Sequence, residues 1–587
     1  MGFLRAIATD LDGTLTADGD VPSEVMSALA AIRLENIRTL LVTGRTRAEL
    51  TLAFPGLASA FDAVVAENGA VLATRSGSRR LAPAVDETLR HALTNRGITV
   101  GRGEVLLACA ADHWPTVAEE IGRLGLDSQM IHNRAALMIL PSGISKGTGL
   151  REALAEFNLS PHNSIAIGDA ENDLALLEVA EIGVAVANAV PSLREHADLV
   201  LDEPGGAGTA KFLNGPLVKG ARRFCPPRRW LPVGNFDDGQ PATLPGGQAN
   251  LLIAGPSGHG KSYLAGLLVE TWVQADYRVL VIDPEGDHSG LAQLRETALV
   301  GGEFLPGATA VVDRLEGSSI VLDLSQLPPA DKVTYARKVL QAADLSRAVR
   351  GVPHWILIEE AQLLIPDSDF TAQLRRLTGR GEVLVTHQPE ALPNDVAALI
   401  DITLTVPATA PTSGELTTHP PRVFLDYEGR RREFTTSARR TPHTRHRRKY
   451  TNNVLQPHQG FYFHASPGEP TRCARNLTEF VGQLGTLDRA ALDFHLVRGD
   501  FSRWITGTLQ DPRLGQHIAT IEHDAVTAQA LSAEHARRRL TDAVSARYLL
   551  TPNLGTDAVI DLTAGTGRRR TDHDATDLDT PPPTSAK

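Results

Sequence analysis

Short apolar runs alternate with amphipathic stretches along the first 214 residues of the chain. Segments 37–42 (IRTLLV) and 164–168 (SIAIG) have the length and composition of buried strands. Segments 22–35 and 146–157 carry apolar residues at helical spacing. This alternation predicts an α/β fold with a doubly wound parallel sheet covered by helices on both faces. Between about 75 and 140 the pattern changes, which predicts an inserted α+β subdomain.

A second alternation of strands and helices occupies residues 248–429. It follows a stretch rich in Pro, Gly and Arg, 215–247, which predicts a linker leading into a second α/β domain. The remaining parts are expected to be a basic linker at 430–454, a small mainly helical accessory domain at 455–548, and a disordered tail at 565–587.

The composition is that of a soluble multidomain protein. The 587 residues are too many for one hydrophobic core, and 42% hydrophobic with 22% charged residues is ordinary for globular proteins. No apolar run approaches the ~18 residues that span a bilayer, and Asp10 and Asp12 interrupt the apolar N-terminus. Three cysteines without metal-ligand spacing fit a reducing compartment. We therefore expect a cytoplasmic protein without a membrane partner.

Polar residues stand at the ends of several predicted strands in the first domain. The first strand ends at Asp10 and Asp12 in DLDGTLT, and two carboxylates so close together repel unless a cation or a division of roles separates them. Doubly wound folds place their ligands at the carboxyl ends of strands. Later strand ends supply compatible partners, namely Thr43 in LLVTGR, Lys146 in SGISKGTGL, and Asp169, Asn172 and Asp173 in IGDAENDLALL.

This ordered set resembles the motifs of the haloacid dehalogenase (HAD) superfamily, which are DxDGT, a strand-terminal Ser or Thr, a Lys, and GDxxND. The resemblance covers residues 1 to about 213 and implies a phosphatase that uses Mg²⁺. It implies that Asp10 is the nucleophile, which forms an aspartyl-phosphate, and that Asp12 is the general acid and base. Thr43 would bind the phosphoryl oxygens, and Lys146 would offset the charge of Asp10. The implied metal ligands are Asp10, the backbone carbonyl of Asp12, and Asp169, with Asp173 acting through water or orienting the site.

The insertion after Thr43, together with AENGAVL at 66–72, resembles the HAD subclass whose cap follows the second motif. That subclass includes phosphoglycolate, sucrose-phosphate and other sugar-phosphate phosphatases. A cap closes over a small substrate and excludes water, whereas it would obstruct a protein or a polynucleotide. The resemblance therefore implies that the substrate is a small phosphorylated metabolite.

The stretch GPSGHGKS at 255–262 matches the phosphate-binding pattern G-x-x-x-x-G-K-[ST]. It follows a strand-like run and precedes a helical one, which is the context that this motif needs. Backbone amides of such a loop bind anionic phosphates. We expect Lys261 to reach the β- and γ-phosphates of ATP and Ser262 to bind a second Mg²⁺. The other loop residues expected around the nucleotide are Gly255, Ser257, Gly258, His259 and Gly260.

The run HWILIEEAQLL predicts a strand that ends in Glu359 and Glu360. Acids at this position suit the second half of a nucleotide site, where Glu359 would help the metal and Glu360 would polarise the attacking water. The alternative is a pair of exposed acids at the start of a helix. The next strand, EVLVTHQP, ends in Thr386, His387 and Gln388, of which Gln388 is the preferred sensor of the γ-phosphate.

This order of motifs resembles HerA/FtsK-type ATPases and the related conjugation motors over roughly 225–435. Many members have Asp at the first acidic position, where this chain has Glu359. These ATPases usually act as rings, so the resemblance implies a homo-oligomer in which an arginine of one subunit completes its neighbour's site. Arg376 and Arg380 are the candidates, and each is also consistent with an ordinary surface arginine.

Three interpretations of the whole chain stay open. The first is a bifunctional protein that joins a phosphatase of small metabolites to an ATPase of regulatory or motor role. The second is a nucleic-acid machine that couples an ATP-driven translocase to a phosphatase for end processing. The third, in which one site is a degraded sensor, is the weakest because both sites retain their expected groups. The basic stretch at 430–450 fits either nucleic-acid contact or a solvated linker, while the net charge of −11 disfavours wholesale coating of nucleic acid.

Overall fold

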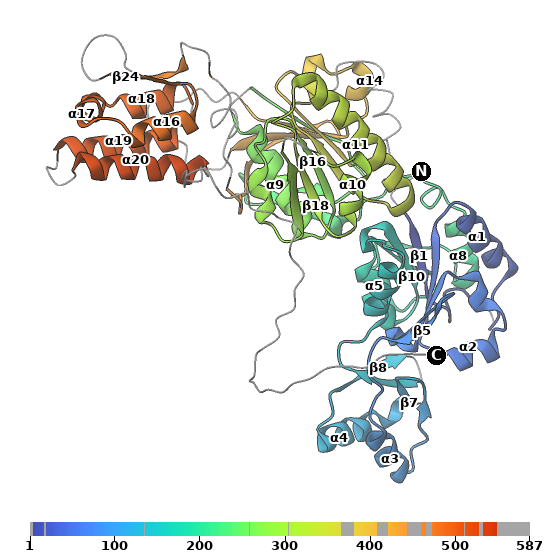
Figure 1. Cartoon of the computed structure of the whole chain (residues 1–587). Coiled ribbons are helices and arrows are strands. Elements are labelled where there is room, and N and C mark those ends of the chain that lie inside the picture. The colour runs from blue at the N-terminus through green and yellow to red at the C-terminus, as the bar shows by residue number, and fades with distance from the viewer. Residues whose placement is uncertain are drawn as a thin grey trace, which may run out of the picture.

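The computed structural model shows the chain as three packed units in sequence order (Figure 1). It describes residues 4–548 except 17–18, 134–135, 257–258, 303–304, 365–380, 408–420, 443–454, 456–458, 465–471, 510 and 528–531. Among the described helices, none combines the length and the apolar character needed to cross a membrane.

The first unit is built on a sheet whose central strands are parallel. Its described strands follow the order β12–β11–β10–β1–β2–β3–β4–β5, and β4 and β5 run antiparallel at one edge. Figure 1 shows α5 on one side of this sheet and α1 with α8 on the other, which is the expected doubly wound arrangement. The strands are β1 (Ala6–Thr9), β2 (Arg38–Val42), β3 (Ala63–Ala66), β4 (Val71–Thr74), β5 (Gly77–Arg80), β10 (Ser164–Gly168), β11 (Ile182–Ala185) and β12 (Leu199–Val200). The helices are α1 (Ser23–Leu34), α2 (Arg47–Ala53), α5 (Lys146–Glu156), α6 (Leu174–Val179), α7 (Pro191–His196) and α8 (Gly205–Leu213).

A small α+β subdomain is inserted between β5 and α5, where the sequence pattern changes. Its antiparallel sheet has the strand order β6–β7–β9–β8, and a separate apolar cluster packs beneath helices α3 and α4. The elements are β6 (Gly101–Arg102), β7 (Leu107–Ala110), β8 (Ser128–Asn133), β9 (Ala136–Pro141), α3 (Glu87–Asn95) and α4 (Trp114–Leu124). This subdomain is the expected cap.

The second unit is a larger mixed sheet with the strand order β14–β13–β23–β22–β21–β15–β20–β19–β16–β18–β17. The strands from β21 to β17 are parallel, and the other four add to one edge as antiparallel hairpins, within the described ranges. The strands are β13 (Trp230–Phe236), β14 (Pro241–Pro245), β15 (Leu251–Ala254), β16 (Val279–Asp283), β17 (Thr297–Gly301), β18 (Ser319–Asp323), β19 (Trp355–Ile358), β20 (Glu382–Thr386), β21 (Ile402–Thr405), β22 (Arg422–Tyr427) and β23 (Arg430–Thr436). The helices are α9 (Lys261–Gln274), α10 (Ala308–Asp313), α11 (Pro329–Arg350), α12 (Ala361–Leu364) and α14 (Asn394–Ala397).

Two stretches that the sequence suggests are linkers contribute strands to this second sheet. Strands β13 and β14 lie within 215–247, and β23 lies within 430–454. Strand β23 has only one apolar residue, Phe434, and only Phe434 and Thr436 are buried, so its sequence gives no apolar strand pattern. Beyond β23, the guanidinium of Arg439 is buried and pairs with Glu270 of α9 at 2.9 Å. This part of the basic stretch therefore stabilises the second unit, and residues 443–454 lie outside the described residues.

The third unit is mainly helical, as expected, and its core is aromatic. The rings of Phe461, Phe480, Phe501 and Trp504 contact one another beneath the helices. Its elements are β24 (Phe461–Phe463), β25 (Arg472–Ala474), α16 (Leu477–Gly485), α17 (Arg489–Arg498), α18 (Asp500–Gly507), α19 (Pro512–Thr527) and α20 (Ala533–Tyr548).

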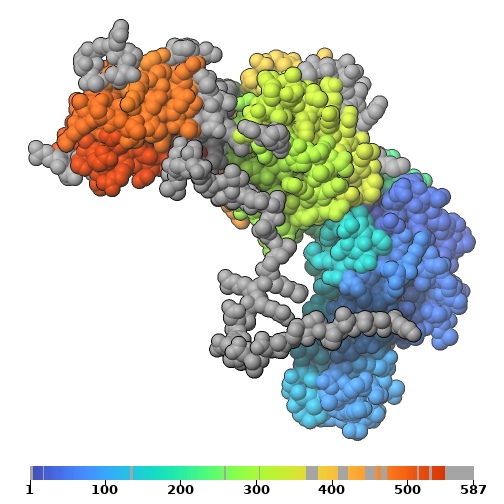
Figure 2. Space-filling model, in the orientation of Figure 1, coloured from blue at the N-terminus to red at the C-terminus, as the bar shows by residue number. Residues whose placement is uncertain are grey.

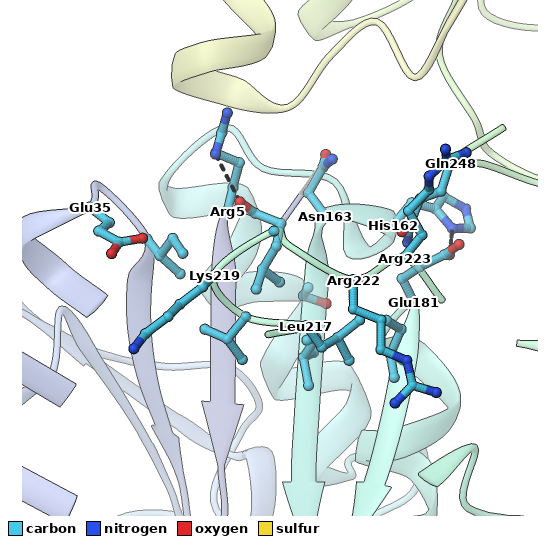
Figure 3. A pocket seen from close by; sticks show the side chains of 17 residues that line it. Arg5, Glu35, His162, Asn163, Glu181, Leu217, Lys219, Arg222, Arg223 and Gln248 are labelled. Carbon is cyan, nitrogen blue, oxygen red and sulfur yellow. Dashed lines mark hydrogen bonds and ion pairs between the residues drawn. The ribbon is translucent and has the colours of Figure 1, made fainter. Parts of the chain in front are cut away.

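The first two units abut (Figure 2) and are joined at the amino-terminal edges of their sheets. Bonds that cross this junction include those from Arg5 to the carbonyl of Arg347 (2.7 and 3.0 Å), from Asn163 to Gly351 O (3.1 Å), between His162 and Ala275 O (2.8 Å), and from Tyr277 to Glu181 (3.0 Å). A cavity of about 70 Å³ beside the junction is lined by Arg5, His162 and Glu181 and by the cations Lys219 and Arg222 (Figure 3). Because both sets of strands run away from the junction, the carboxyl ends of the two sheets lie on opposite sides of it.

Candidate active sites

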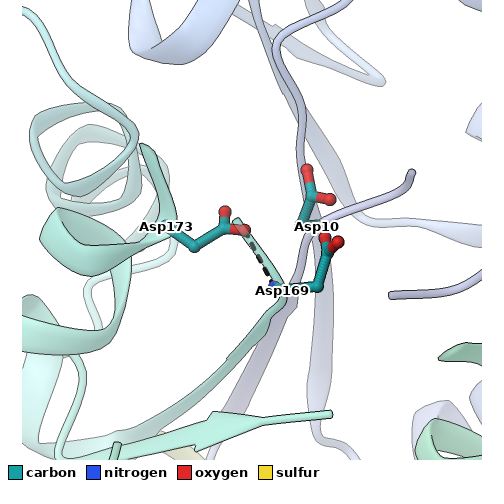
Figure 4. A group of neighbouring side chains, drawn as sticks. All are labelled: Asp10, Asp169 and Asp173. Carbon is teal, nitrogen blue, oxygen red and sulfur yellow. Dashed lines mark hydrogen bonds between the residues drawn. The ribbon is translucent and has the colours of Figure 1, made fainter. Parts of the chain in front are cut away.

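The first site lies at the carboxyl ends of β1 and β10. Asp10 follows β1, Asp169 follows β10, and Asp173 lies in the turn that leads into α6. Their carboxylates are buried and converge, with an oxygen of each within 4.8 Å of the others (Figure 4). Sequence motifs far apart in the chain are thus brought together as expected.

Lys146, the first residue of α5, completes this cluster. Its Nζ donates to Asp10 Oδ1 and to Asp173 Oδ1, both at 2.6 Å, and the side chain is 2% exposed. Ser145 places it there, because the Ser145 hydroxyl accepts from Thr148 N in a capping box that starts α5 at Lys146. The position of this cation is therefore fixed by a helix N-terminus.

The carboxylates of the first site outnumber its buried ammonium group. Burial raises the pKa of Asp10 to about 8, with Lys146 opposing the shift and the Asp173 and Asp169 carboxylates adding to it. Burial would lower the pKa of Lys146, yet the carboxylates of Asp10 and Asp173 raise it above its usual value. Three buried carboxylates facing one ammonium leave room for further positive charge. An all-oxygen set of this kind suits Mg²⁺.

Asp173 and Asp169 make further hydrogen bonds within the site. Asp173 Oδ2 accepts from the amides of Asp169 and Ala170, each at 3.0 Å, and Thr14 Oγ1 donates to Asp169 Oδ1 at 3.1 Å. Asp173 therefore orients the loop after β10 as well as facing Lys146. Direct binding of a metal by Asp173 stays a prediction.

Asp12 is not part of this buried carboxylate group, and its side chain is 43% exposed. Its two carboxyl oxygens accept from Nε and Nη2 of Arg45, both at 2.7 Å, in a two-armed ion pair. The fully buried Thr43 accepts from Arg45 N at 3.2 Å. Arg45 was not singled out from the sequence, although its place two residues after Thr43 in LLVTGR was the available signal.

The second site surrounds the loop between β15 and α9. Gly255 and Gly260 have φ of +149° and +108°, and a Cβ on Gly255 would lie 2.4 Å from Val406 O. Lys261 is the first residue of α9, and its Nζ donates to Pro256 O at 3.0 Å. Ser262 follows on the same first turn, and His259 lies in the loop. The expected residues Ser257 and Gly258 lie outside the described residues, as do Arg376 and Arg380.

Glu359 follows β19 and is buried beside His288, for which the sequence pattern indicates no role. His288 Nε2 lies 2.7 Å from Glu359 Oε1, and His288 is fully buried. The amide of His288 donates to Asp283, whose pKa burial raises to about 6 against the opposing charge of His288. The signal in the sequence was DPEGDH directly after a strand. A metal role for Glu359 stays a prediction.

Glu360 has a left-handed backbone, with φ of +48°. Its Oε2 contacts Gln362 Nε2 and lies 3.1 Å from His387 Nδ1, and Gln362 accepts from Thr386 Oγ1 at 2.6 Å. Gln388, the preferred sensor, has an exposed side chain, and its amide donates to Thr386 at 3.0 Å. The structure thus brings His387 to the expected catalytic glutamate, while a sensor role for Gln388 stays a prediction.

Two family profiles match the chain. The profile of haloacid dehalogenase-like hydrolases matches residues 7–84 and 118–213. The profile of the central domain of the helicase HerA matches residues 248–352. The first match covers both parts of the core and the later part of the inserted subdomain, and the second begins just before β15.

Curated relatives resemble the first unit. A phosphoglycolate phosphatase of Methanoculleus marisnigri is 33% identical over 230 residues, which are 35% of this chain and 94% of that protein. Phosphoglycolate phosphatase 2 of Saccharolobus solfataricus is 30% identical over 219 residues, with 35% of this chain and 90% of the relative covered. The phosphoglycolate phosphatase of Sulfurisphaera tokodaii is 29% identical over 224 residues, with 37% and 95% covered.

Solved structures align with the same part of the chain. A haloacid dehalogenase-like hydrolase from Bacteroides thetaiotaomicron aligns at 20% identity with a TM-score of 0.33, over 36% of this chain and 98% of its own. One from B. subtilis aligns at 19% identity with a TM-score of 0.32, over 36% and 100%.

Proposed function

The first unit of this chain belongs to the haloacid dehalogenase-like hydrolases, and from that premise we propose that it is a Mg²⁺-dependent phosphatase of small phosphorylated metabolites. The observation that carries the proposal is the buried Lys146 Nζ, 2.6 Å from both Asp10 and Asp173, beside Asp169. Phosphoglycolate is the first substrate to test, because the relatives that cover the whole unit bear that name.

The reaction divides into two steps on the residues of this chain. An oxygen of Asp10 attacks phosphorus and forms an aspartyl-phosphate, while Asp12 gives a proton to the leaving oxygen. Asp12 then takes a proton from the water that hydrolyses the intermediate. Lys146 and Thr43 offset and bind the phosphoryl charge. Mg²⁺ held among Asp10, Asp169 and Asp173 would supply further positive charge beside the phosphoryl oxygens.

A panel of phosphorylated metabolites tests this function. Phosphoglycolate and sugar phosphates would be incubated with the whole chain and Mg²⁺, and released phosphate measured, with the Asp10→Asn chain as the background. Turnover of at least one metabolite above that background supports the proposal. Release that is equal in both proteins would refute it.

The second unit is a HerA-type P-loop ATPase domain, and we propose that it binds and hydrolyses ATP in a regulatory or motor role. Lys261 at the start of α9 and Glu360 beside His387 support this assignment. We further propose that it works as a homo-oligomer, as ring ATPases do. ATPase activity per subunit should then rise with protein concentration, and a monomer of constant specific activity in light scattering would refute the oligomer.

A nucleic-acid machine for end processing is the second candidate, and the match to the HerA central domain is the observation that favours it. Against it stand the cap over the first site and the placement of the two catalytic edges on opposite sides of the junction. Dephosphorylation of 3′-phosphorylated DNA, faster than of any metabolite and stimulated by ATP, would favour this candidate. If DNA stimulates ATP hydrolysis but is not dephosphorylated, the phosphatase would still be assigned to small metabolites.

A further inference from the structure

A strained turn lies between β3 and β4, directly beside the phosphatase site. Glu67, Asn68 and Gly69 have φ of +53°, +54° and +109°, so three successive residues are in the left-handed region. Two of them carry side chains, for which this conformation is unfavourable. Such strain persists where the surrounding contacts hold the backbone in place.

The second and third residues of this turn are packed against three of the four catalytic motifs. Asn68 N donates to Thr43 O at 3.0 Å, and Asn68 Oδ1 accepts from Asn172 Nδ2 at 2.9 Å. Gly69 lies so close to the backbone before Lys146 that a Cβ would come within 1.9 Å of Ser145 O. The turn therefore has one fixed position relative to the active site.

The first residue of the turn reaches in the other direction, into the cap. The Glu67 side chain is fully buried, and its Oε1 accepts from Glu104 N at 2.7 Å. Its Oε2 accepts from Val105 N at 2.8 Å and from Leu106 N at 2.9 Å. These amides belong to the loop between β6 and β7. A carboxylate that accepts three amide hydrogens makes charge-assisted bonds, which are shorter and stronger than neutral ones.

We propose that Glu67 is a positioning residue that sets where the cap sits over the phosphatase site and thereby governs turnover of substrates that the cap contacts. The chain enters the cap after β5 and leaves it before α5, and the Glu67 carboxylate adds an attachment close to the catalytic motifs. Because Glu67 and Asn68 are consecutive, the cap loop is placed relative to Thr43 and Asn172 by one rigid turn. This inference rests on the proposed phosphatase function.

Two substitutions break this attachment, one in the Glu67 side chain and one in the cap loop that it binds. Glu67→Gln removes the charge and turns an NH₂ group toward amide hydrogens. Gly103→Ala leaves Glu67 unchanged but places a Cβ 2.5 Å from its carboxyl group, so the two groups must separate. The matched controls are Glu104→Gln, which keeps the backbone amide and alters only an exposed pair with Arg47, and Gly122→Ala, whose Cβ meets no atom within 4 Å.

The experiment compares these four variants with the unmodified chain by hydrogen exchange and by steady-state kinetics. The substrates are the best metabolite of the panel and acetyl phosphate, whose leaving group is too small to need the cap. We expect faster exchange confined to the amides of 104–106 in Glu67→Gln and Gly103→Ala. Their kcat/KM for the metabolite should fall at least about tenfold, roughly the loss of one charged hydrogen bond, while acetyl phosphate changes less than about twofold. Both controls should behave as the unmodified chain.

Three results would overturn the proposal. Unchanged metabolite kinetics in both variants would show that the attachment does not matter for turnover. Equal losses for both substrates, with exchange raised throughout the first unit, would show a merely structural role. Unchanged exchange at 104–106 would show that Glu67 does not hold the loop. If the unmodified chain hydrolyses none of the compounds, the phosphatase proposal fails separately, and the exchange data still decide whether Glu67 holds the cap.

Discussion

The imidazole of His162 lies stacked on the phenol ring of Tyr277, with the ring centroids 3.7 Å apart and the planes 18° from parallel. His162 precedes β10, the strand that leads to Asp169, and Tyr277 precedes β16, the strand that ends at Asp283 of the second unit. Glu181 joins them, because it accepts from the Tyr277 hydroxyl and lies 2.7 Å from His162 Nδ1. These buried polar groups are satisfied only while the two units stay together.

The junction between the two units determines the directions in which the two candidate sites open. Each sheet is attached at its amino-terminal edge and carries its catalytic groups at the other edge, so the two sites open away from each other. Direct transfer of a substrate between the sites has no support in this arrangement. Any communication between them has to pass through the packed elements that meet at the junction.

Replacement of Asp10 by Asn should abolish phosphatase turnover and leave ATP hydrolysis unchanged. The amide cannot act as the nucleophile, and loss of such a group reduces turnover by at least about 10³-fold. Phosphate release from metabolites and from ATP would be measured on the same preparation. Retention of more than a few per cent of metabolite turnover in clean protein would contradict the role of Asp10.

Replacement of Asp169 by Ala should raise the Mg²⁺ concentration needed for half-maximal phosphatase activity. Removing groups that merely support metal ligands costs about 10–100-fold in metal affinity, so loss of a ligand should cost at least that much. A magnesium titration of the variant and of the unmodified chain provides the measurement. Superimposable titrations would exclude Asp169 as a ligand.

Replacement of Glu360 by Gln should leave ATP binding intact and slow its hydrolysis by about 10²–10⁴-fold, the usual contribution of a general base. The Gln side chain can still bond His387 and Gln362, so the local structure should persist. Binding of a fluorescent ATP analogue and phosphate release would be measured together, with Lys261→Ala as the variant expected to lose binding. Normal hydrolysis in Glu360→Gln would place the catalytic base elsewhere.

The stability of the junction should fall at mildly acidic pH because of His354. Burial, aided by the nearby His162, Arg278 and Arg347, holds the pKa of His354 well below its ordinary value of 6.5. The unfolded chain therefore takes up a proton below pH 6.5 that the folded chain refuses, so the free energy of unfolding falls as pH drops from about 7, by up to about 1.4 kcal/mol per pH unit.

His354→Gln provides the test of this pH dependence. In the folded chain His354 Nδ1 accepts from Arg278 N at 2.7 Å, and Nε2 lies 3.2 Å from Asn163 Oδ1. A Gln side chain can make both bonds without titrating. The melting temperatures of both proteins would be measured at pH 7.5 and at pH 5.5. Because all other titratable groups are shared, the unmodified chain should lose more in melting temperature between the two pH values than the variant does. An equal fall in melting temperature for the two proteins would mean that His354 does not contribute to the pH dependence of stability.

Local sequence was sufficient for the parts of this protein whose geometry is set within a few residues. The strand, the left-handed glycines and the helix that begins at Lys261 are consecutive, so the phosphate loop can be predicted from its letters. The same holds for Asp10 and Asp169, because polar residues directly after two parallel neighbouring strands must meet at one edge of the sheet.

Only the tertiary structure decided the contacts between segments that no short pattern connects. The bonds of Glu67 to the cap loop, of Arg45 to Asp12 and of His288 to Glu359 join residues 33–71 positions apart. Strand β23 forms a local hairpin with β22, but its pairing with β13 joins segments about two hundred residues apart. The reason is physical: a side chain carries the same donors and acceptors wherever it stands, and only the folded backbone determines which partners come within hydrogen-bond distance.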